Sequence, residues 1–480
     1  MDRGTSLLVV RVLSTRTVKP PPRPRELIPL TAWDVSLLGA DYIQKGLLFP
    51  PPPFPTTSAL LDHLEASLAD ALAVYYPVAG RLAVDERRDD GWSVSINCSG
   101  QGAELLHAVA DGVGVVDVVP PDANDDVPAC LVRLFFPLNH AVNNFDGCEL
   151  PLFAVQVTEL RDGVFLGFAY NHALSDGTSF WAFINAWAEI ARARHLHPGA
   201  APRVLTPPLL QRWFPEEPDE GGDAVVLLPY ADLEFLRKTA RETPPPPVLL
   251  RERMLHFSAD SLASLKDRAR RDLLASGDAA GAAAVTTFQA LSSLLWRSVT
   301  RARRPAPDQP VVFRASVNCR GRLRPPLPPE YFGNSILAAS TGPVPSSELI
   351  LASRAHGRAA ALVGRAVAAH STDAFVRGRL AGAPPSVAAF RLADANAMFV
   401  SSSPRFDMYG CDFGWGKPVA ARSGKGNKYD GKVSLFPGWE GGGAIVAEVE
   451  LAPDHMAALE QDDELWDAVS PDKPYQAIKH

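Results

Sequence analysis

Tyr170-Asn171-His172-Ala173-Leu174-Ser175-Asp176-Gly177 stands where an apolar segment, which predicts a strand, gives way to a predicted amphipathic helix. A histidine placed directly after a rigid strand suits catalysis, and imidazole is the natural general base near neutral pH. The Asp-Gly step predicts a tight bend that turns the carboxylate of Asp176 away from the imidazole. That carboxylate is then either an orienting partner of His172 or a structural anchor. Because H-x-x-x-D also arises by chance, a core or capping histidine is the competing interpretation.

Outward from this stretch, strands and helices are interspersed in both halves of the chain, which predicts a mixed α/β architecture. Residues 197–223 are rich in Pro, Glu and Gly, and the run Pro244–Pro247 follows, which indicates an exposed crossover. We predict two domains, residues 1–195 and 249–480, joined by a Pro-rich crossover at 196–248. The predicted strands are 7–12, 92–98, 153–160, 164–170, 311–317, 398–401, 432–436 and 444–451. The predicted helices are one that Thr57 or Ser58 caps, one after Gly177, and those at 262–274, 287–303 and 352–380.

Composition excludes several classes of protein. The 480 residues are 46% hydrophobic and carry a formal net charge of −7, which predicts a globular chain without the basic surface of a nucleic-acid-binding protein. No run approaches the roughly 18 apolar residues of a membrane span, and the first residues lack the features of a signal or transit peptide, so we expect a cytosolic protein. The five cysteines and scattered histidines predict reduced thiols and no metal site.

A second motif lies far down the chain, where Asp412-Phe413-Gly414-Trp415-Gly416 places a glycine on each side of a tryptophan. With both motifs intact and in this order, the sequence resembles the plant BAHD acyltransferases, whose hallmarks are H-x-x-x-D-G near the middle and D-F-G-W-G near the C-terminal end. Further matches to the family are YPVAGRL at 76–82, TFQAL at 287–291, VNCRGRL at 317–323, PPLP at 325–328 and YFGN at 331–334.

The resemblance implies a chloramphenicol acetyltransferase-like α/β fold: two similar-sized domains, each a mixed β-sheet with flanking helices, and a channel between them. It implies a monomer that uses acyl-CoA as co-substrate and holds no tightly bound cofactor. Acyl-CoA would enter one mouth of the channel and a small-molecule acceptor the other. His172 would remove the proton of an acceptor hydroxyl or amine, which attacks the thioester carbonyl. The acceptor would be a plant specialised or cuticular metabolite.

The resemblance also implies roles for residues around the base. Asp176, followed by Gly177, would point away from the channel and pair with Arg320, so that the loop holds His172 in reach of the acceptor. Asn334 would help to keep His172 oriented.

Other residues are assigned to the second motif and to CoA. Asp412 is often counted with the family's catalytic residues, although holding the CoA side of the channel is the favoured interpretation, and Trp415 is expected to be a packing wedge. Hydroxyls and clustered cations suit pantetheine and the adenosine phosphates, although an ordinary solvated loop would also explain the cations. The candidates for contacting CoA are Thr287, Ser401, Ser402, Arg422, Lys425 and Lys428.

One position departs from the family pattern. Many members carry a tryptophan that stabilises the oxyanion where this chain has Ser403, within Ser401-Ser402-Ser403-Pro404-Arg405-Phe406. Losing one oxyanion donor can cost on the order of 3 kcal/mol, so either Ser403, a backbone amide or a water replaces it, or the reaction needs less stabilisation. The departure keeps two alternatives open: a conjugate lyase of the same fold that uses no CoA, and a binding protein without catalysis.

Overall fold

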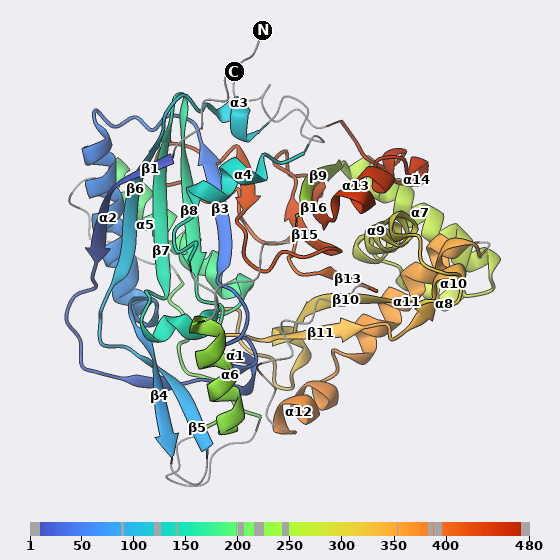
Figure 1. Cartoon of the computed structure of the whole chain (residues 1–480), viewed down its shortest axis with the longest axis horizontal. Coiled ribbons are helices and arrows are strands. Elements are labelled where there is room, and N and C mark those ends of the chain that lie inside the picture. Colours follow the sequence, from blue (N-terminus) through green and yellow to red (C-terminus); the bar gives the residue numbers. More distant parts are fainter. Residues whose placement is uncertain are drawn as a thin grey trace.

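The computed structural model describes residues 10–87, 91–119, 126–140, 143–197, 199, 206–215, 225–241, 249–352, 354–382, 387 and 396–471. Two halves lie side by side, each built on its own sheet (Figure 1). The first sheet has the strand order β1-β6-β7-β8-β3-β14. Its strands are β1 (Val10–Val18), β6 (Ala103–Ala110), β7 (Phe153–Leu160), β8 (Gly163–Tyr170), β3 (Ile43–Phe49) and β14 (Ala420–Ser423).

Strand β8 is the central strand that leads to the predicted base. All eight of its residues are buried, as its unbroken apolar run predicts. Helices α2 (Thr57–Val74) and α5 (Gly177–Leu196) pack against each other. Phe183 and Trp187 of α5 make edge-to-face contacts with Phe153 and Phe168, so α5 covers one face of this sheet. The hydrophobic core between this sheet and α5 therefore supports the loop between β8 and α5.

Smaller elements complete the first half. A three-stranded sheet has the order β2-β5-β4. Its strands are β2 (Leu27–Pro29), β5 (Gly91–Asn97) and β4 (Arg81–Arg87). The short helices are α1 (Ala32–Val35), α3 (Val115–Val118) and α4 (Ala129–Val132), with single 3₁₀ turns at Tyr76–Ala79, Arg133–Phe135 and Asn144–Cys148. Helix α6 (Tyr230–Arg241) lies within the predicted crossover.

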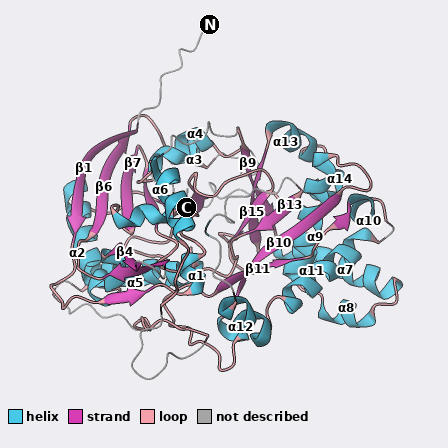
Figure 2. Ribbon diagram, turned by 60° about the horizontal axis from the view of Figure 1, so that its bottom comes forward, coloured by secondary structure: helices cyan, strands magenta, loops and turns pink. Residues whose placement is uncertain are grey.

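The second sheet runs β11-β10-β13-β15-β16-β9, and β12 pairs with β10 beside it. Its strands are β9 (Arg251–Phe257), β10 (Pro310–Asn318), β11 (Ile336–Ser340), β12 (Val344–Pro345), β13 (Ala397–Val400), β15 (Lys432–Pro437) and β16 (Ile445–Leu451). Figure 2 shows most helices of this half gathered on the side of the sheet away from the first half, with α12 apart from them at the bottom of the view. The gathered helices are α7 (Ala259–Ala275), α8 (Ala279–Ala284), α9 (Thr287–Arg303), α10 (Ser346–Ile350), α11 (Ala355–Ala369), α13 (Pro453–Leu459) and α14 (Asp463–Trp466). Helix α12 spans Asp373–Ala381, and a 3₁₀ turn spans Arg320–Arg322.

The structure departs from the predicted domain division at one place. Strand β14 lies in the C-terminal part of the chain, yet it pairs antiparallel with β3, with Ala420 opposite Leu48 and Ser423 opposite Lys45. The chain therefore returns to the first sheet after the second motif and then crosses back to form β15. This exchange ties the two halves together by backbone hydrogen bonds.

Two details of the predicted helices are wrong. The helix assigned to 352–380 is two helices, α11 and α12, because Thr372 starts a new one by accepting a hydrogen bond from the backbone N–H of Phe375. The N-cap of α2 is Thr56 rather than Thr57 or Ser58, and it accepts from the N–H of Ala59. In the part of the chain that the structure describes, no helix has the length and apolar character needed to span a membrane.

Candidate active site

His172 lies in the loop between the end of β8 and the start of α5, where its backbone is held from both sides. Its N–H donates to Asn144 Oδ1 at 2.7 Å, and its carbonyl accepts from Asn334 Nδ2 at 2.8 Å. The residue is half-buried. Burial lowers the pKa of His172, against the opposing effects of its own carbonyl, Asp176 and Asn334. The imidazole is therefore neutral at pH 7, which is the form that a general base requires.

Asp176 anchors the loop through both of its carboxylate oxygens. Its Oδ1 accepts from the N–H groups of Thr178 and Ser179 at 3.0 and 3.2 Å, which caps α5. Its Oδ2 accepts from Arg320 Nη1 at 2.6 Å and from the N–H of Ser335 at 2.9 Å. The carboxylate is buried, with 1% of its side chain exposed.

Arg320 extends this anchor to the second half of the molecule. Its Nη2 donates to Asp176 Oδ1 at 3.0 Å and to the carbonyls of Tyr331 and Gly333 at 3.2 and 2.9 Å. Because these two carbonyls lie within the three residues before Asn334, one guanidinium aligns the loop that carries the base with the loop that carries Asn334.

Gly177 allows the segment Ser402–Phe406, which includes Ser403, to approach the loop of His172. A Cβ built on Gly177 would come within 2.8 Å of Phe406 Cζ, so the ring packs directly against the glycine. Ser403 Oγ accepts from the N–H of Arg405 at 3.2 Å, and its carbonyl accepts from Phe406 N–H at 3.3 Å. The segment therefore forms a compact turn that rests on the start of α5.

The second motif forms a loop that Asp412 closes. Asp412 Oδ1 accepts from the N–H groups of Gly414 and Gly416 at 2.8 and 2.9 Å. Both glycines have a positive φ, +111° and +104°, which residues other than glycine rarely adopt. Trp415 stacks on Phe413 with ring centroids 5.7 Å apart.

A cavity of about 410 Å³ lies beside this loop. Asp412, Gly410 and Tyr331 line it, together with Ser179 and Asn185 from one face of α5, while His172 is absent from its lining among the described residues. Asp412 and the predicted base do not share this cavity, and Asp412 Oδ1 serves two backbone N–H groups. A loop-forming role accounts for Asp412.

Substitutions of Asp412 separate that role from proton transfer. We expect Asp412→Asn to retain the turnover number within about threefold, because an amide oxygen can still accept the two N–H groups. We expect Asp412→Ala to lower the free energy of unfolding by about 1–2 kcal/mol, the cost of losing a capping-type acceptor. Thermal unfolding and kcat measure the two effects. A loss of activity in Asp412→Asn with unchanged stability would instead indicate chemistry at this carboxylate.

The candidates for CoA contact divide into two groups. Thr287, the first residue of α9, and Ser401 and Ser402, which follow β13, are half-buried. The Lys425 side chain donates to the carbonyl of Asn139. The structure does not show these residues converging on one point.

Arg422 and Lys428 are buried in the protein instead. Arg422 Nη1 and Nη2 donate to the carbonyls of Ala421 and Val118. Lys428 is 3% exposed and faces the carboxylates of Glu252, Glu448 and Glu450. Because their charges are engaged inside the fold, we no longer expect Arg422 or Lys428 to bind a phosphate.

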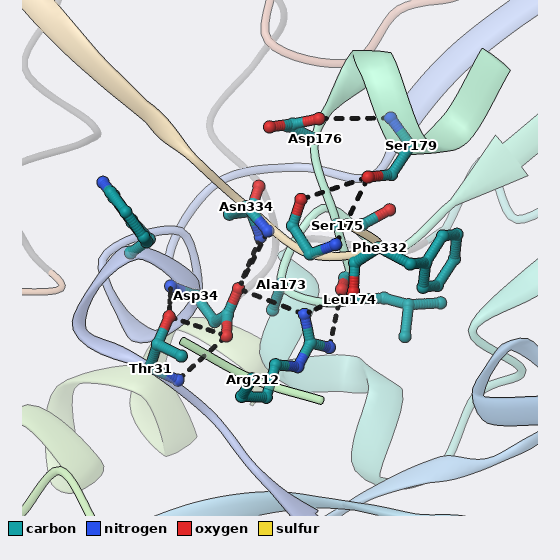
Figure 3. A network of polar contacts seen from close by, with 12 residues as sticks. Thr31, Asp34, Ala173, Leu174, Ser175, Asp176, Ser179, Arg212, Phe332 and Asn334 are labelled. Carbon is teal, nitrogen blue, oxygen red and sulfur yellow. Dashed lines mark hydrogen bonds and ion pairs between the residues drawn. The ribbon is translucent and has the colours of Figure 1, made fainter. Parts of the chain in front are cut away.

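Several residues of this region were not predicted from the sequence. The buried cluster around Lys428 also includes Lys45 from β3 and Lys432 from β15, and the latter contributes to the lowered pKa of His172. Figure 3 shows a second unpredicted group, in which Asp34 and Arg212 meet Asn334 and the loop after His172. The one sequence signal at Asp34 is the T-x-x-D pattern at 31–34, which is typical of a helix start and does not indicate a role at the site.

Comparison with known sequences gives a family match over almost the whole chain. The sequence model of the Transferase family matches residues 8–466. An uncharacterised acetyltransferase of Arabidopsis thaliana is 35% identical over 443 residues, covering 91% of this chain and 93% of the relative. BAHD acyltransferase DCR of the same plant is 31% identical, covering 94% of this chain and 91% of the relative.

Solved structures confirm the predicted fold. Vinorine synthase superposes with a TM-score of 0.68 at 19% identity, covering 97% of this chain and 100% of that one. TRI101 of F. sporotrichioides, solved with coenzyme A and T-2, gives a TM-score of 0.66 at 16% identity, with 94% and 100% covered. The two-domain fold of mixed sheets and helices is the one that the motifs implied. The match over residues 8–466 and the relatives at 35% and 31% identity show that this chain belongs to the Transferase family and is a BAHD acyltransferase.

Proposed function

We propose that the protein transfers an acyl group from a CoA thioester to a hydroxyl or amine of a small plant metabolite, with His172 as the general base. His172 Nε2 takes the proton of the acceptor as its oxygen or nitrogen attacks the thioester carbonyl. The new C–O or C–N bond forms, the C–S bond breaks, and the proton passes to the departing CoA thiolate. The neutral, half-buried imidazole at the end of β8, clamped through Asn144 and Asn334, is the observation that carries this proposal.

Two sets of contacts would support the reaction. The half-buried hydroxyls of Thr287, Ser401 and Ser402, with Lys425, are our candidates for binding CoA. Ser403 is the candidate oxyanion donor, because its hydroxyl accepts from the N–H of Arg405 and keeps its own hydrogen free to donate. TRI101 was solved with coenzyme A, and a relative from Avena sativa is named for hydroxycinnamoyl-CoA, which supports a CoA thioester as donor.

A screen of substrates tests the proposal. The purified protein is incubated with pooled hydroxy and amino metabolites in the presence and absence of a set of acyl-CoA donors, and products are identified by mass spectrometry. We expect products that carry the acyl mass and appear only with acyl-CoA. Turnover of a conjugate without any CoA thioester would support the lyase alternative and contradict acyl transfer.

The pH dependence of the rate follows from the lowered pKa of His172. Protonation removes the base, so activity falls on the acidic side, and because burial lowers this pKa the fall begins below the ordinary value of about 6.5. We expect kcat/KM to be level from about pH 7 to 8 and to decrease tenfold per pH unit at the acidic limit. A profile whose acidic midpoint lies above 6.5 would contradict the lowered pKa.

A further inference from the structure

Asp34 is a fully buried carboxylate that connects the N-terminal segment to the active-site loop. Its Oδ2 accepts from the backbone N–H and the hydroxyl of Thr31 at 2.8 and 2.9 Å, which closes the start of α1. Its Oδ1 accepts from the side-chain Nδ2 of Asn334 at 2.8 Å. One carboxylate oxygen suffices for the helix start, so the second is available for Asn334 (Figure 3).

The contact with Asp34 fixes the orientation of the Asn334 side-chain amide. An amide has one nitrogen with two hydrogens and one oxygen that only accepts. Nδ2 donates to Asp34 Oδ1 and to the carbonyl of His172, both at 2.8 Å. A flipped amide would place its oxygen against two other acceptors, one of them charged. Asp34 therefore holds Asn334 in one orientation.

This orientation bears on the imidazole. Asn334 Oδ1 and His172 Nδ1 are both buried, and neither has a partner in hydrogen-bond geometry among the described residues. The Asn334 amide and the carbonyl of His172 itself nevertheless favour the protonated ring, as acceptors near a ring N–H do. In a neutral imidazole one nitrogen carries the hydrogen and the other accepts. An acceptor that faces Nδ1 favours the tautomer with its hydrogen on Nδ1, and that tautomer leaves Nε2 free.

Arg212 is the cation that pairs with Asp34. Its Nη1 lies 3.9 Å from Asp34 Oδ1, and the two side chains are 3% and 0% exposed. Arg212 Nη1 also donates to the carbonyl of Phe332 at 3.2 Å, and Nη2 donates to that of Leu174 at 2.9 Å. A buried carboxylate is costly unless it is paired. The guanidinium both pairs it and fastens the loops on either side of Asn334 and His172.

We propose that Asp34, paired with Arg212, is a positioning residue of the reaction: it orients the Asn334 amide so that His172 keeps its hydrogen on Nδ1 and presents Nε2 as the base. The proposal rests on the proposed function in taking His172 as the base. Asp34 touches neither the acceptor nor the thioester in this scheme, and its effect on the imidazole passes through the Asn334 amide.

The tautomer of His172 is the direct readout. The protein is labelled with ¹⁵N-histidine, and the His172 signals are assigned by their loss in His172→Gln. We expect the unaltered protein above pH 7 to show Nδ1 protonated and Nε2 unprotonated. In Asp34→Asn the new amide can donate to a flipped Asn334, so a mixture of tautomers is expected. Unchanged signals in Asp34→Asn would overturn the proposal.

Kinetics give a second readout. We expect Asp34→Asn to lower kcat by about 10–10²-fold, as misplacement of a catalytic group does, with the KM for acyl-CoA within about twofold. Because Asp34 acts through Asn334, the same substitution made in the Asn334→Ala background should change kcat by less than about twofold. An equal loss in both backgrounds would show that Asp34 acts by another route and would overturn the proposal.

Two further variants guard against a purely structural effect. Thr31→Val removes a hydroxyl from Asp34 Oδ2 and leaves the contact with Asn334, so it should lower stability without changing the tautomer or kcat. If Asp34→Asn does not fold, Asn334→Ala tests the proposal in its place. This variant should shift the tautomer of His172 by itself. An unshifted tautomer would overturn the proposal. The proposed function and the positioning role can fail separately. If the NMR signals show the expected tautomers but no CoA-dependent acyl transfer is found, the proposed function is contradicted and the positioning role of Asp34 remains.

Discussion

His172→Gln is expected to lower kcat of acyl transfer by about 10²–10⁴-fold, the range that a general base contributes. Glutamine retains a polar side chain of similar length but cannot take up the acceptor's proton. The backbone contacts of residue 172 with Asn144 and Asn334 do not involve the ring, so the fold and the affinity for acyl-CoA should be preserved. Initial rates of CoA release with saturating donor and acceptor measure the effect.

A matched control for this variant is the substitution of another histidine. His455 lies in the second half, where its Nδ1 contacts Asp430 Oδ1 at 3.0 Å. We expect His455→Gln to retain kcat within about twofold. Activity of His172→Gln close to that of the unaltered protein would remove the imidazole from the mechanism.

Arg320→Met is expected to cause the largest loss of stability among single substitutions at the site. Asp176 and Arg320 are 1% and 6% exposed, so methionine would leave a buried carboxylate without its cation. Breaking a buried pair in this way typically costs about 3–5 kcal/mol. We expect the free energy of unfolding in urea to fall by this amount, and kcat to fall with it because the loops of His172 and Asn334 lose their common anchor.

Two companion variants make the result specific to the ion pair. Arg322→Met changes an exposed arginine two residues away and should alter stability by less than about 0.5 kcal/mol. The double variant Asp176→Asn with Arg320→Met removes both charges, and it should be more stable than Arg320→Met alone. If all three variants lose the same stability, the pair is not what holds the loop.

The surroundings of His172 could be predicted because their signals are local. The apolar run of β8 and the Asp-Gly step that starts α5 are contiguous in sequence, so strand, loop and helix follow from periodicity and capping. The pairing of Asp176 with Arg320 needed the family resemblance, because the two residues lie 144 positions apart.

The exchange of β14 into the first sheet was not predictable. Its four residues, Ala420–Ser423, carry no pattern that specifies which strand they join, and the partner β3 lies in the other half of the chain. The same limit applies to Asp34, whose T-x-x-D pattern predicts a helix start and says nothing of Asn334, which is 300 positions away.

The alternation of charges along β16 shows a different limit of sequence patterns. Glu448 and Glu450 alternate with apolar residues, as in a strand with one face in water. In the structure they are 0% and 1% exposed and face Lys428. Periodicity identifies the face on which a charge lies but not whether water or an opposite charge covers that face.

The central claim, that the neutral imidazole of His172 is the base, is tested most directly by comparing two titrations. The pKa of His172 is measured by NMR in the free protein, and the acidic pKa of kcat/KM is measured under the same conditions. Burial predicts that both lie below about 6.5 and coincide. The account would be contradicted if the acidic pKa of kcat/KM differed from the pKa of His172 measured by NMR. It would also be contradicted if the residual activity of His172→Gln still fell at the same acidic pKa.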